Sequence, residues 1–234
     1  MALQYACFVT GTDTGVGKTL VSAALVNALA SSGLEAVGMK PVAAGVSRFD
    51  GREANEDVEV LAAESSVELP LAITSPYVFR EACAPHVAAA LEHVVIEQEV
   101  LLDAFRTASE RAEAVVVEGV GGFRVPLSDD FDTADLAVGL QLDVILVVGL
   151  RLGCLNHALL TAEAIAARGL TLAGWIANQV DPAMPHQEAN LAALQVRLEA
   201  PLIGVIPWME TPLADVAADH LDFDLLPSWP VPRG

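Results

Sequence analysis

The chain has 234 residues, 53% of them hydrophobic and 18% charged, and its 31 acidic and 12 basic side chains give a formal net charge of −19. A chain of this length and composition can bury one sizeable core, so we expect one domain over residues 1–234. The excess of acidic over basic residues argues against a nucleic acid or an anionic membrane surface as a partner, because both are bound through basic patches.

Short apolar runs alternate with longer helical patterns along the chain. Most of the runs are nearly continuous in apolar residues, which is typical of parallel strands covered on both faces. In chain order the predicted elements are strand 6–10, helix 18–31, strand 36–39, helix 55–64, helix 85–92, helix 97–111, strand 114–118, strand 144–148, helix 154–167, strand 172–178, helix 186–198 and strand 202–206. This alternation predicts an α/β fold with a doubly wound, mostly parallel sheet and helices on both faces. The Pro-rich tail over 226–234 is expected to be irregular.

A glycine-rich loop connects the first predicted strand to the first predicted helix. Residues 11–19 read Gly-Thr-Asp-Thr-Gly-Val-Gly-Lys-Thr, and this motif requires a strand before it and a helix after it. Gly15 and Gly17 let backbone N–H groups turn toward phosphate oxygens. Lys18 can neutralise the β- and γ-phosphates, and the Thr19 hydroxyl can reach Mg²⁺. The loop therefore predicts a nucleotide-binding fold of the P-loop NTPase type.

Two acidic positions are candidates for binding the Mg²⁺ that accompanies a triphosphate. Mg²⁺ prefers oxygen ligands and keeps some waters, so one or two carboxylates are expected near the phosphates. Glu118 ends an apolar strand, which places it at the edge where open α/β sheets bind ligands. Asp57 lies at the start of a predicted helix, where an acid also favours the helix dipole. Spacing alone does not separate Asp57 from Glu56.

Arginine supplies nearly all of the positive charge. Ten of the 12 basic residues are Arg, and only Lys18 and Lys40 are Lys. In a chain that otherwise uses arginine, a remaining lysine is a candidate for chemistry that needs a compact ammonium group. Lys40 follows the second predicted strand, so we expect it at the same sheet edge as the phosphate loop.

Taken together and in order, the motifs resemble the dethiobiotin synthetase family, whose members use ATP to close a ring in biotin biosynthesis. The resemblance runs over most of the chain. It is carried by Gly11–Thr19, Gly38–Val42, Pro76-Tyr77, Ala84-Pro85-His86, Val117–Gly122, Pro126–Asp129, Leu152–His157, Leu172–Asn178 and Ile206-Pro207-Trp208. It implies that one amine of 7,8-diaminononanoate takes up CO₂ as a carbamate and that the carbamate attacks the γ-phosphate of ATP. The second amine then closes the ureido ring and expels phosphate.

The resemblance also implies roles for individual residues. Lys18, Lys40 and Thr14 would act at the transferring phosphoryl group, where cations and N–H donors are needed rather than a protein nucleophile. Mg²⁺ would be held by Thr19, Asp57 and Glu118. ATP would contact Thr12, Asp13, Thr14, Gly15, Val16, Gly17, Lys18, Thr19, Glu118, Asn178, Pro207, Trp208 and Met209. The diamine would contact Lys40, Ala44, Val120, Gly121, Leu152, Gly153, Asn156 and, from the partner subunit of a homodimer, Asn190.

Two positions depart from the pattern of the family. Ala44 stands where a hydroxyl residue is common, which removes one candidate hydrogen bond to the substrate. Val120 replaces a commoner alanine and adds bulk near the diamine. Neither position is predicted to bind phosphate, so the two departures concern the fit of the diamine.

Three other interpretations stay open on the sequence alone. A partitioning or septum-positioning ATPase would have the same fold, but it would carry a second loop lysine at the position of Asp13 and a basic amphipathic helix at its C-terminus. An amidating synthetase for large corrinoid acids would need a glutaminase domain with a Cys–His pair, for which we expect no room in 234 residues. An inactive relative would bind ATP without turnover, and the presence of Lys40, Asp57 and Glu118 speaks against it.

The remaining sequence features bear on location. The first residues lack a basic region before their short apolar run, so no signal peptide is expected. The apolar tract over 138–155 is interrupted by Asp143 and Arg151, so no transmembrane segment is expected. The three cysteines are scattered and the histidines lack zinc-ligand spacing. A cytoplasmic protein is the prediction.

Overall fold

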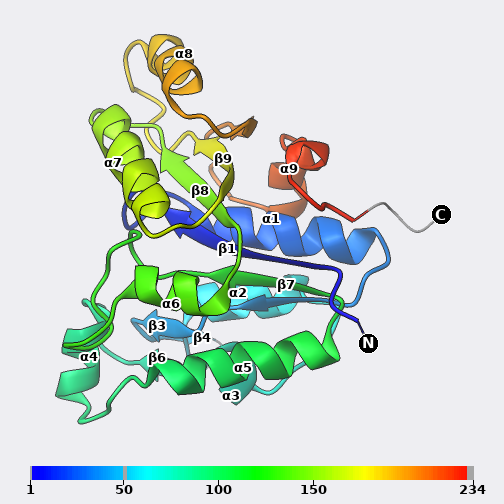
Figure 1. The fold of residues 1–234 in the computed structure, drawn as a ribbon, viewed down its shortest axis with the longest axis vertical. Helices are drawn as coiled ribbons and strands as arrows, with labels where there is room; N and C mark the ends of the chain where they lie inside the picture. The colour runs from blue at the N-terminus through cyan, green and yellow to red at the C-terminus, as the bar shows by residue number, and fades with distance from the viewer. Residues whose placement is uncertain (1, 50–51, 231–234) are drawn as a thin grey trace.

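The computed structural model describes residues 2–49 and 52–230, and its centre is a parallel six-stranded sheet (Figure 1). The strand order is β10-β9-β8-β1-β7-β2, so β1 lies between β7 and β8 and the chain winds outward from it in both directions. Such a reversal of winding places a crevice at the carboxyl ends of the central strands. The sheet strands are β1 (Tyr5–Gly11), β2 (Ala36–Met39), β7 (Ala114–Glu118), β8 (Val144–Gly149), β9 (Leu172–Asn178) and β10 (Leu202–Ile206).

Helices cover both faces of this sheet, as predicted (Figure 1). One face is covered by α1 (Lys18–Ser31), α2 (Glu56–Glu64) and α9 (Ala214–Ala218). The other face is covered by α5 (Gln98–Arg111), α6 (Thr133–Leu140) and α7 (Cys154–Ala167), with α8 (Gln187–Arg197) packed against α7. The shorter elements are β3 (Val42–Ala44), β4 (Ser47–Phe49), β5 (Arg52–Ala54), α3 (Leu71–Thr74), β6 (Tyr77–Phe79), α4 (Pro85–Leu91) and the 3₁₀ turn η1 (Phe223–Leu225).

The apolar strands form two cores because their side chains alternate between the faces. In β1, Cys7 and Val9 pack with the α1 core, whereas Phe8 packs with the α5 and α6 core. In β8, Ile145 joins the α1 side and Leu146 joins the α7 side. A strand buried on both faces needs apolar residues at every position, which accounts for the continuous apolar runs in the sequence.

All predicted strands and helices are present, with ends that agree to within one residue. The elements that sequence analysis missed are short, with eight residues or fewer. Strand β3 pairs in parallel with β6, and β4 pairs antiparallel with β5. The other missed elements are α3, α6, α9 and the 3₁₀ turn η1.

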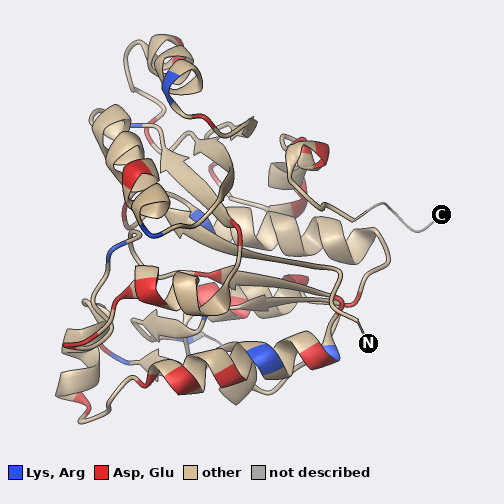
Figure 2. Cartoon of the chain, viewed as in Figure 1, with Lys and Arg blue, Asp and Glu red and all other residues tan. Residues whose placement is uncertain are grey.

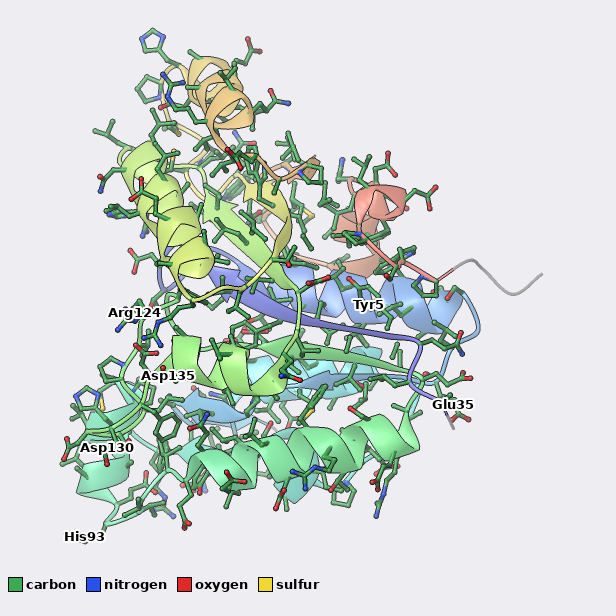
Figure 3. All side chains as sticks on the ribbon, in the orientation of Figure 1. Tyr5, Glu35, His93, Arg124, Asp130 and Asp135 are labelled. Atoms are coloured by element: carbon green, nitrogen blue, oxygen red, sulfur yellow. The ribbon has the colours of Figure 1, made fainter. Side chains whose placement is uncertain are left out.

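Helix α6 begins at a capping box. The Asp132 side chain accepts hydrogen bonds from the N–H groups of Ala134 and Asp135, and the Asp135 side chain accepts one from the N–H of Asp132. Arg124 pairs with Asp132, and Arg168 from the end of α7 pairs with Asp135. Figure 3 shows Arg124 and Asp135 on the same side of the molecule, at the start of α6. These pairs connect the loop after β7 to α6 and α7.

Two further expectations concern the surface and the tail. Acidic residues are spread over many helices and loops (Figure 2). Residues 226–230 contain no helix or strand, in agreement with the expected irregular tail, and 231–234 lie outside the described residues. Over the described part of the chain, no helix has the length and apolarity needed to cross a membrane.

Candidate active site

The phosphate loop lies between the end of β1 and the start of α1. Gly15 and Gly17 have φ values of +71° and +88°, a backbone region that residues with a Cβ rarely adopt. Gly17 is the N-cap of α1, and no side chain caps this helix end. Its free N–H groups and the helix dipole therefore favour an anion at this position. The Lys18 side chain folds back over the loop, and its ammonium group donates to the Asp13 carbonyl at 3.1 Å.

The loop is held to neighbouring strands by buried polar contacts. The Thr12 N–H donates to the Val147 carbonyl at 3.0 Å. Asn178, at the end of β9, donates from Nδ2 to the carbonyl of the buried Val16 at 2.9 Å. These hydrogen bonds attach the phosphate loop to β8 and β9.

Arg151 contacts the phosphate loop, and sequence analysis did not select it. Its Nη2 lies 2.5 Å from Oδ2 of Asp13, while Oδ1 of Asp13 accepts from the Thr14 N–H at 2.8 Å. Arg151 immediately precedes Leu152, so this pair connects the phosphate loop to the loop before α7. The available signal was a single arginine two residues after the end of the fully buried strand β8.

A hydroxyl and two carboxylates meet beside the phosphate loop. Thr19 Oγ1 lies 2.7 Å from Asp57 Oδ1 and 2.9 Å from Glu118 Oε1. The choice between Asp57 and Glu56 is decided by the start of α2, where the Asn55 side chain accepts from the Val58 N–H and turns Glu56 to solvent.

These three side chains fit Mg²⁺. Glu118 is buried, and its Oε2 has no hydrogen-bond partner among the described residues, which leaves a carboxylate oxygen available to a cation. Nowhere in the described residues do three or more His, Cys, Asp or Glu side chains gather in a way that could hold a metal ion. A set of one hydroxyl and two carboxylates leaves positions for phosphate oxygens and water, which is the usual environment of Mg²⁺ at a nucleotide.

Lys40 binds both carboxylates. Its Nζ lies 2.8 Å from Asp57 Oδ2, 2.5 Å from Glu118 Oε1 and 3.1 Å from the Gly119 carbonyl. Burial alone would lower the pKa of Lys40, but the charges of Glu118 and Asp57 outweigh it and hold the pKa above the usual lysine value. Burial, and next to it the charge of Lys40, lower the pKa of Lys18 to about 8.

A cavity of about 820 Å³ opens beside these groups. Its lining includes much of the phosphate loop together with Lys40, Asp57 and Glu118, and it also includes Ala44, Val120 and Gly121 from the predicted diamine set. Segment 82–85, which sequence analysis did not assign to the site, forms part of the wall. Within it Cys83 is exposed, whereas Cys7 and Cys154 are buried.

A second cavity, of about 380 Å³, lies on the other side of the phosphate loop. Gly15, Gly17 and Thr19 line both cavities. The second cavity also contains the residues predicted to frame the base, together with Gln179, which sequence analysis did not select. Its remaining lining is Leu20, Asn178, Gln179, Val180, Pro207, Trp208, Met209 and Pro212.

Four predicted substrate residues lie outside both cavities in the single chain. Leu152, Gly153 and Asn156 are at the start of α7, and Asn190 is on α8, which lies beside α7 (Figure 1). Leu152, directly before the N-cap of α7, is 90% exposed.

Solved structures with a similar fold are distant in sequence. Septum site-determining protein MinD from Pyrococcus horikoshii, complexed with Mg-ADP, is 17% identical with a TM-score of 0.55, and the match covers 96% of this chain and 89% of that one. MinD from Aquifex aeolicus is 18% identical with a TM-score of 0.55, covering 97% and 91%. The cell division protein FtsY from Thermotoga maritima is 15% identical with a TM-score of 0.55, covering 93% and 68%. At these identities the likeness concerns the fold alone, and it confirms the predicted doubly wound, mostly parallel α/β fold.

Sequence relatives are much closer. The AAA domain family matches residues 6–213. The ATP-dependent dethiobiotin synthetase BioD of Janthinobacterium sp. (strain Marseille) is 55% identical over 234 residues, which is 98% of this chain and 99% of the relative. The protein of the same name from Ralstonia nicotianae is 55% identical over 222 residues, covering 95% and 97%. The sequence, the P-loop fold and these relatives agree, and the chain belongs to the AAA domain family and, within it, to the dethiobiotin synthetases.

Proposed function

We propose that this protein is an ATP-dependent dethiobiotin synthetase, which carboxylates 7,8-diaminononanoate with CO₂ and closes the ureido ring, releasing ADP and phosphate. The observation that carries the proposal is the position of Lys40. Its ammonium group lies between Asp57 and Glu118, beside the phosphate loop and on the wall of the larger cavity. A site that activates a carbamate with ATP needs cations at the point where two anions meet.

The residues around the phosphate loop would have separate roles in binding charged groups. Lys18 and the N–H groups of the phosphate loop would bind the triphosphate, and the Thr14 side chain would face the γ-phosphate. Lys40 would lie on the substrate side, where its positive charge stabilises the carbamate anion and its attack on the γ-phosphorus. Mg²⁺, held by Thr19, Asp57 and Glu118, would neutralise charge on the phosphate oxygens.

Each of the two cavities would bind a different substrate group. The smaller one, lined by Asn178, Pro207, Trp208 and Met209, would take the adenine base. The larger one, lined by Ala44, Val120 and Gly121, would take the diamine. The phosphate loop separates them, so the triphosphate would run from the first cavity to the second.

We also propose a homodimer in which each diamine site is completed by the partner. The α7 N-terminus, with Gly153 as an N-cap that has no side-chain bond, offers free N–H groups for the carboxylate of the diamine. Asn190 of the partner would supply a further donor. Support comes from the exposed Leu152, which a partner would cover. A cytoplasmic location and a single domain over the whole chain complete the proposal.

Mixing two inactive variants tests the shared site. Lys40→Arg keeps the positive charge near Asp57 and Glu118, and Asn190→Asp places a carboxylate against the substrate carboxylate. Each variant alone is expected to be nearly inactive. Co-refolded in equal amounts, half of the dimers are mixed and each has one intact site, so about a quarter of the wild-type activity should return. No recovery in mixtures shown to contain mixed dimers would contradict a site shared across the interface.

A partitioning or septum-positioning ATPase is the main competing function, because septum site-determining protein MinD has a similar fold. In this chain Asp13 occupies the position of the second loop lysine and is paired with Arg151.

Isotope transfer from bicarbonate separates the synthetase from this alternative. With ¹⁸O-labelled bicarbonate, MgATP and the diamine, the carbamate oxygen that attacks the γ-phosphorus should leave in the released phosphate. ¹⁸O-labelled phosphate that requires the diamine supports the synthetase. Unlabelled phosphate formed at the same rate without the diamine would overturn it.

A further inference from the structure

Asn55 uses both ends of its side-chain amide. It is the N-cap of α2 and is 7% exposed. Its Oδ1 accepts from the Val58 N–H at 3.2 Å, and its Nδ2 donates to the Gly45 carbonyl at 2.7 Å. The Val58 N–H can only donate and the Gly45 carbonyl can only accept, so the two contacts fix the orientation of the amide. The side chain therefore joins the start of α2 to the segment that follows β3.

The contact with Val58 concerns the metal site. A side-chain acceptor at an N-cap fixes where a helix begins and satisfies a free N–H of its first turn. Asp57 lies in that first turn, and its carboxylate oxygens lie 2.7 Å from Thr19 Oγ1 and 2.8 Å from Lys40 Nζ. The Oδ1 end of Asn55 thus holds the helix turn that carries a candidate Mg²⁺ ligand.

The contact with Gly45 concerns the wall of the larger cavity. Gly45 directly follows Ala44, which lines this cavity. It has a φ of +96°, and a Cβ added there would lie 3.1 Å from the Cβ of Ala82. Ala82 begins segment 82–85, which forms part of the same wall. The Nδ2 end of Asn55 thus holds a glycine that lies between two parts of the wall.

We propose that Asn55 is a positioning residue, which fixes the Mg²⁺ ligand Asp57 and the substrate wall at Ala44 and Gly45 relative to each other. In the chain, β4 and β5 separate the two segments, and the Asn55 amide bridges them across ten positions. Asn55 itself does not line the larger cavity. The inference rests on the proposed function, because that function assigns the metal and the diamine to these two places.

Two comparisons between variants each isolate one end of the amide. Asn55→Asp keeps an acceptor for the Val58 N–H, and aspartate is as good an N-cap as asparagine, but its second oxygen faces the Gly45 carbonyl. Asn55→Ser and Asn55→Ala both lose the contact with Gly45, and of these two only the serine variant keeps a cap. Asn27→Asp is the matched control, because Asn27 donates to Glu64 at the opposite end of α2 at 2.8 Å and the change adds the same charge.

Three measurements follow the two ends separately. Steady-state kinetics give KM and kcat for the diamine. The ratio of the Kd of ATP in EDTA to its Kd with Mg²⁺ reports on the metal site without turnover. The rate of maleimide labelling at the exposed Cys83 reports on the wall without any substrate, because Cys83 follows Ala82.

The variants should separate the two contacts. Asn55→Asp should raise KM for the diamine about tenfold, with less than about a threefold change in kcat, because a repulsive contact replaces a hydrogen bond. Asn55→Ser should also raise KM, and both variants should keep the wild-type Kd ratio. In Asn55→Ala the Kd ratio should fall about threefold in addition, because the cap is lost. Cys83 labelling should speed up about twofold or more in all three, since a wall segment that has lost a contact opens more often. Asn27→Asp should match the wild type throughout.

Two results would overturn the inference. One is a wild-type KM with a wild-type rate of Cys83 labelling in Asn55→Asp, and the other is the same Kd ratio in Asn55→Ser and Asn55→Ala. A purely structural role would produce both, because it would lower the unfolding midpoint and the amount of active protein alone. Failure of the proposed function is distinguishable. In that case the Kd ratios and the labelling rates would follow the expected pattern, while the wild type would form no ADP that depends on the diamine.

Discussion

Replacement of Lys40 by methionine should destabilise the free protein because it leaves two carboxylates without their cation. The side chains of Lys40 and Glu118 are 3% and 0% exposed, and the ammonium lies 2.5 Å from the Glu118 oxygen. The Asp57 carboxylate, at 2.8 Å, is 37% exposed and is therefore partly screened by water. Most of the effect should come from Glu118.

The size of the effect follows from the burial of that pair. Removing one partner of a buried ion pair costs about 3–5 kcal/mol, because the other charge stays desolvated. For a chain of this size each kcal/mol lowers the unfolding midpoint by roughly 2–4 °C, so Lys40→Met should lower it by roughly 6–20 °C.

A double-mutant cycle with Glu118→Gln separates the ion pair from packing. Urea unfolding gives the free energies of the wild type, both single variants and Lys40→Met/Glu118→Gln at neutral pH. The double variant has no buried unpaired charge at this position, so it should be more stable than the sum of the single losses predicts, by about 2 kcal/mol. If the losses of the two single variants add up to the loss of the double variant to within about 0.5 kcal/mol, the reasoning is refuted.

Three further predictions concern the phosphate loop and the larger cavity. The pKa of Lys18 is about 8 in the free protein, and a bound triphosphate favours its charged form, so ATP binding should take up a proton above about pH 8. ATP affinity should therefore fall by about tenfold from pH 7 to pH 9, and calorimetry in buffers of different ionisation enthalpy should detect the proton; a flat profile would contradict the prediction. Gly17→Ala, at φ +88°, should weaken ATP binding by at least about tenfold while the fold persists, and unchanged affinity in titration would contradict it. A maleimide should label Cys83 but not the buried Cys7 and Cys154 in the folded protein, and the diamine with ATP should slow that labelling; mass spectrometry showing unchanged labelling would place the diamine elsewhere.

Features encoded locally in the sequence could be predicted from it. The 11–19 motif contains its own strand, turn and helix start, and Gly15 and Gly17 have the positive φ values that the turn needs. The continuous apolar runs predicted a parallel sheet because each strand faces two cores. Helix α6 was missed although Asp132 and Asp135 form a capping box, because the apolar tract that follows conceals where the helix ends.

Features created by contacts between distant segments could not be predicted. Arg151 reaches Asp13 across 138 positions of sequence, and no spacing rule relates them. Gln179 lines the smaller cavity only because β10 pairs with β9 and brings the 207–209 segment beside it. Spacing alone does not separate Asp57 from Glu56: the resemblance selected Asp57, and in the structure the helix start capped by Asn55 is where Asp57 contacts Thr19. The residues of α7 and α8 proposed for the substrate carboxylate depend on a second subunit.

The most direct test of the central claim is ring closure itself. Purified protein is incubated with MgATP, ¹⁴C-bicarbonate and 7,8-diaminononanoate, and acid-stable label and phosphate are measured together. The account predicts acid-stable label and phosphate in equal amounts, both dependent on the diamine. Phosphate release that is indifferent to the diamine and to bicarbonate, with no acid-stable label, would contradict it.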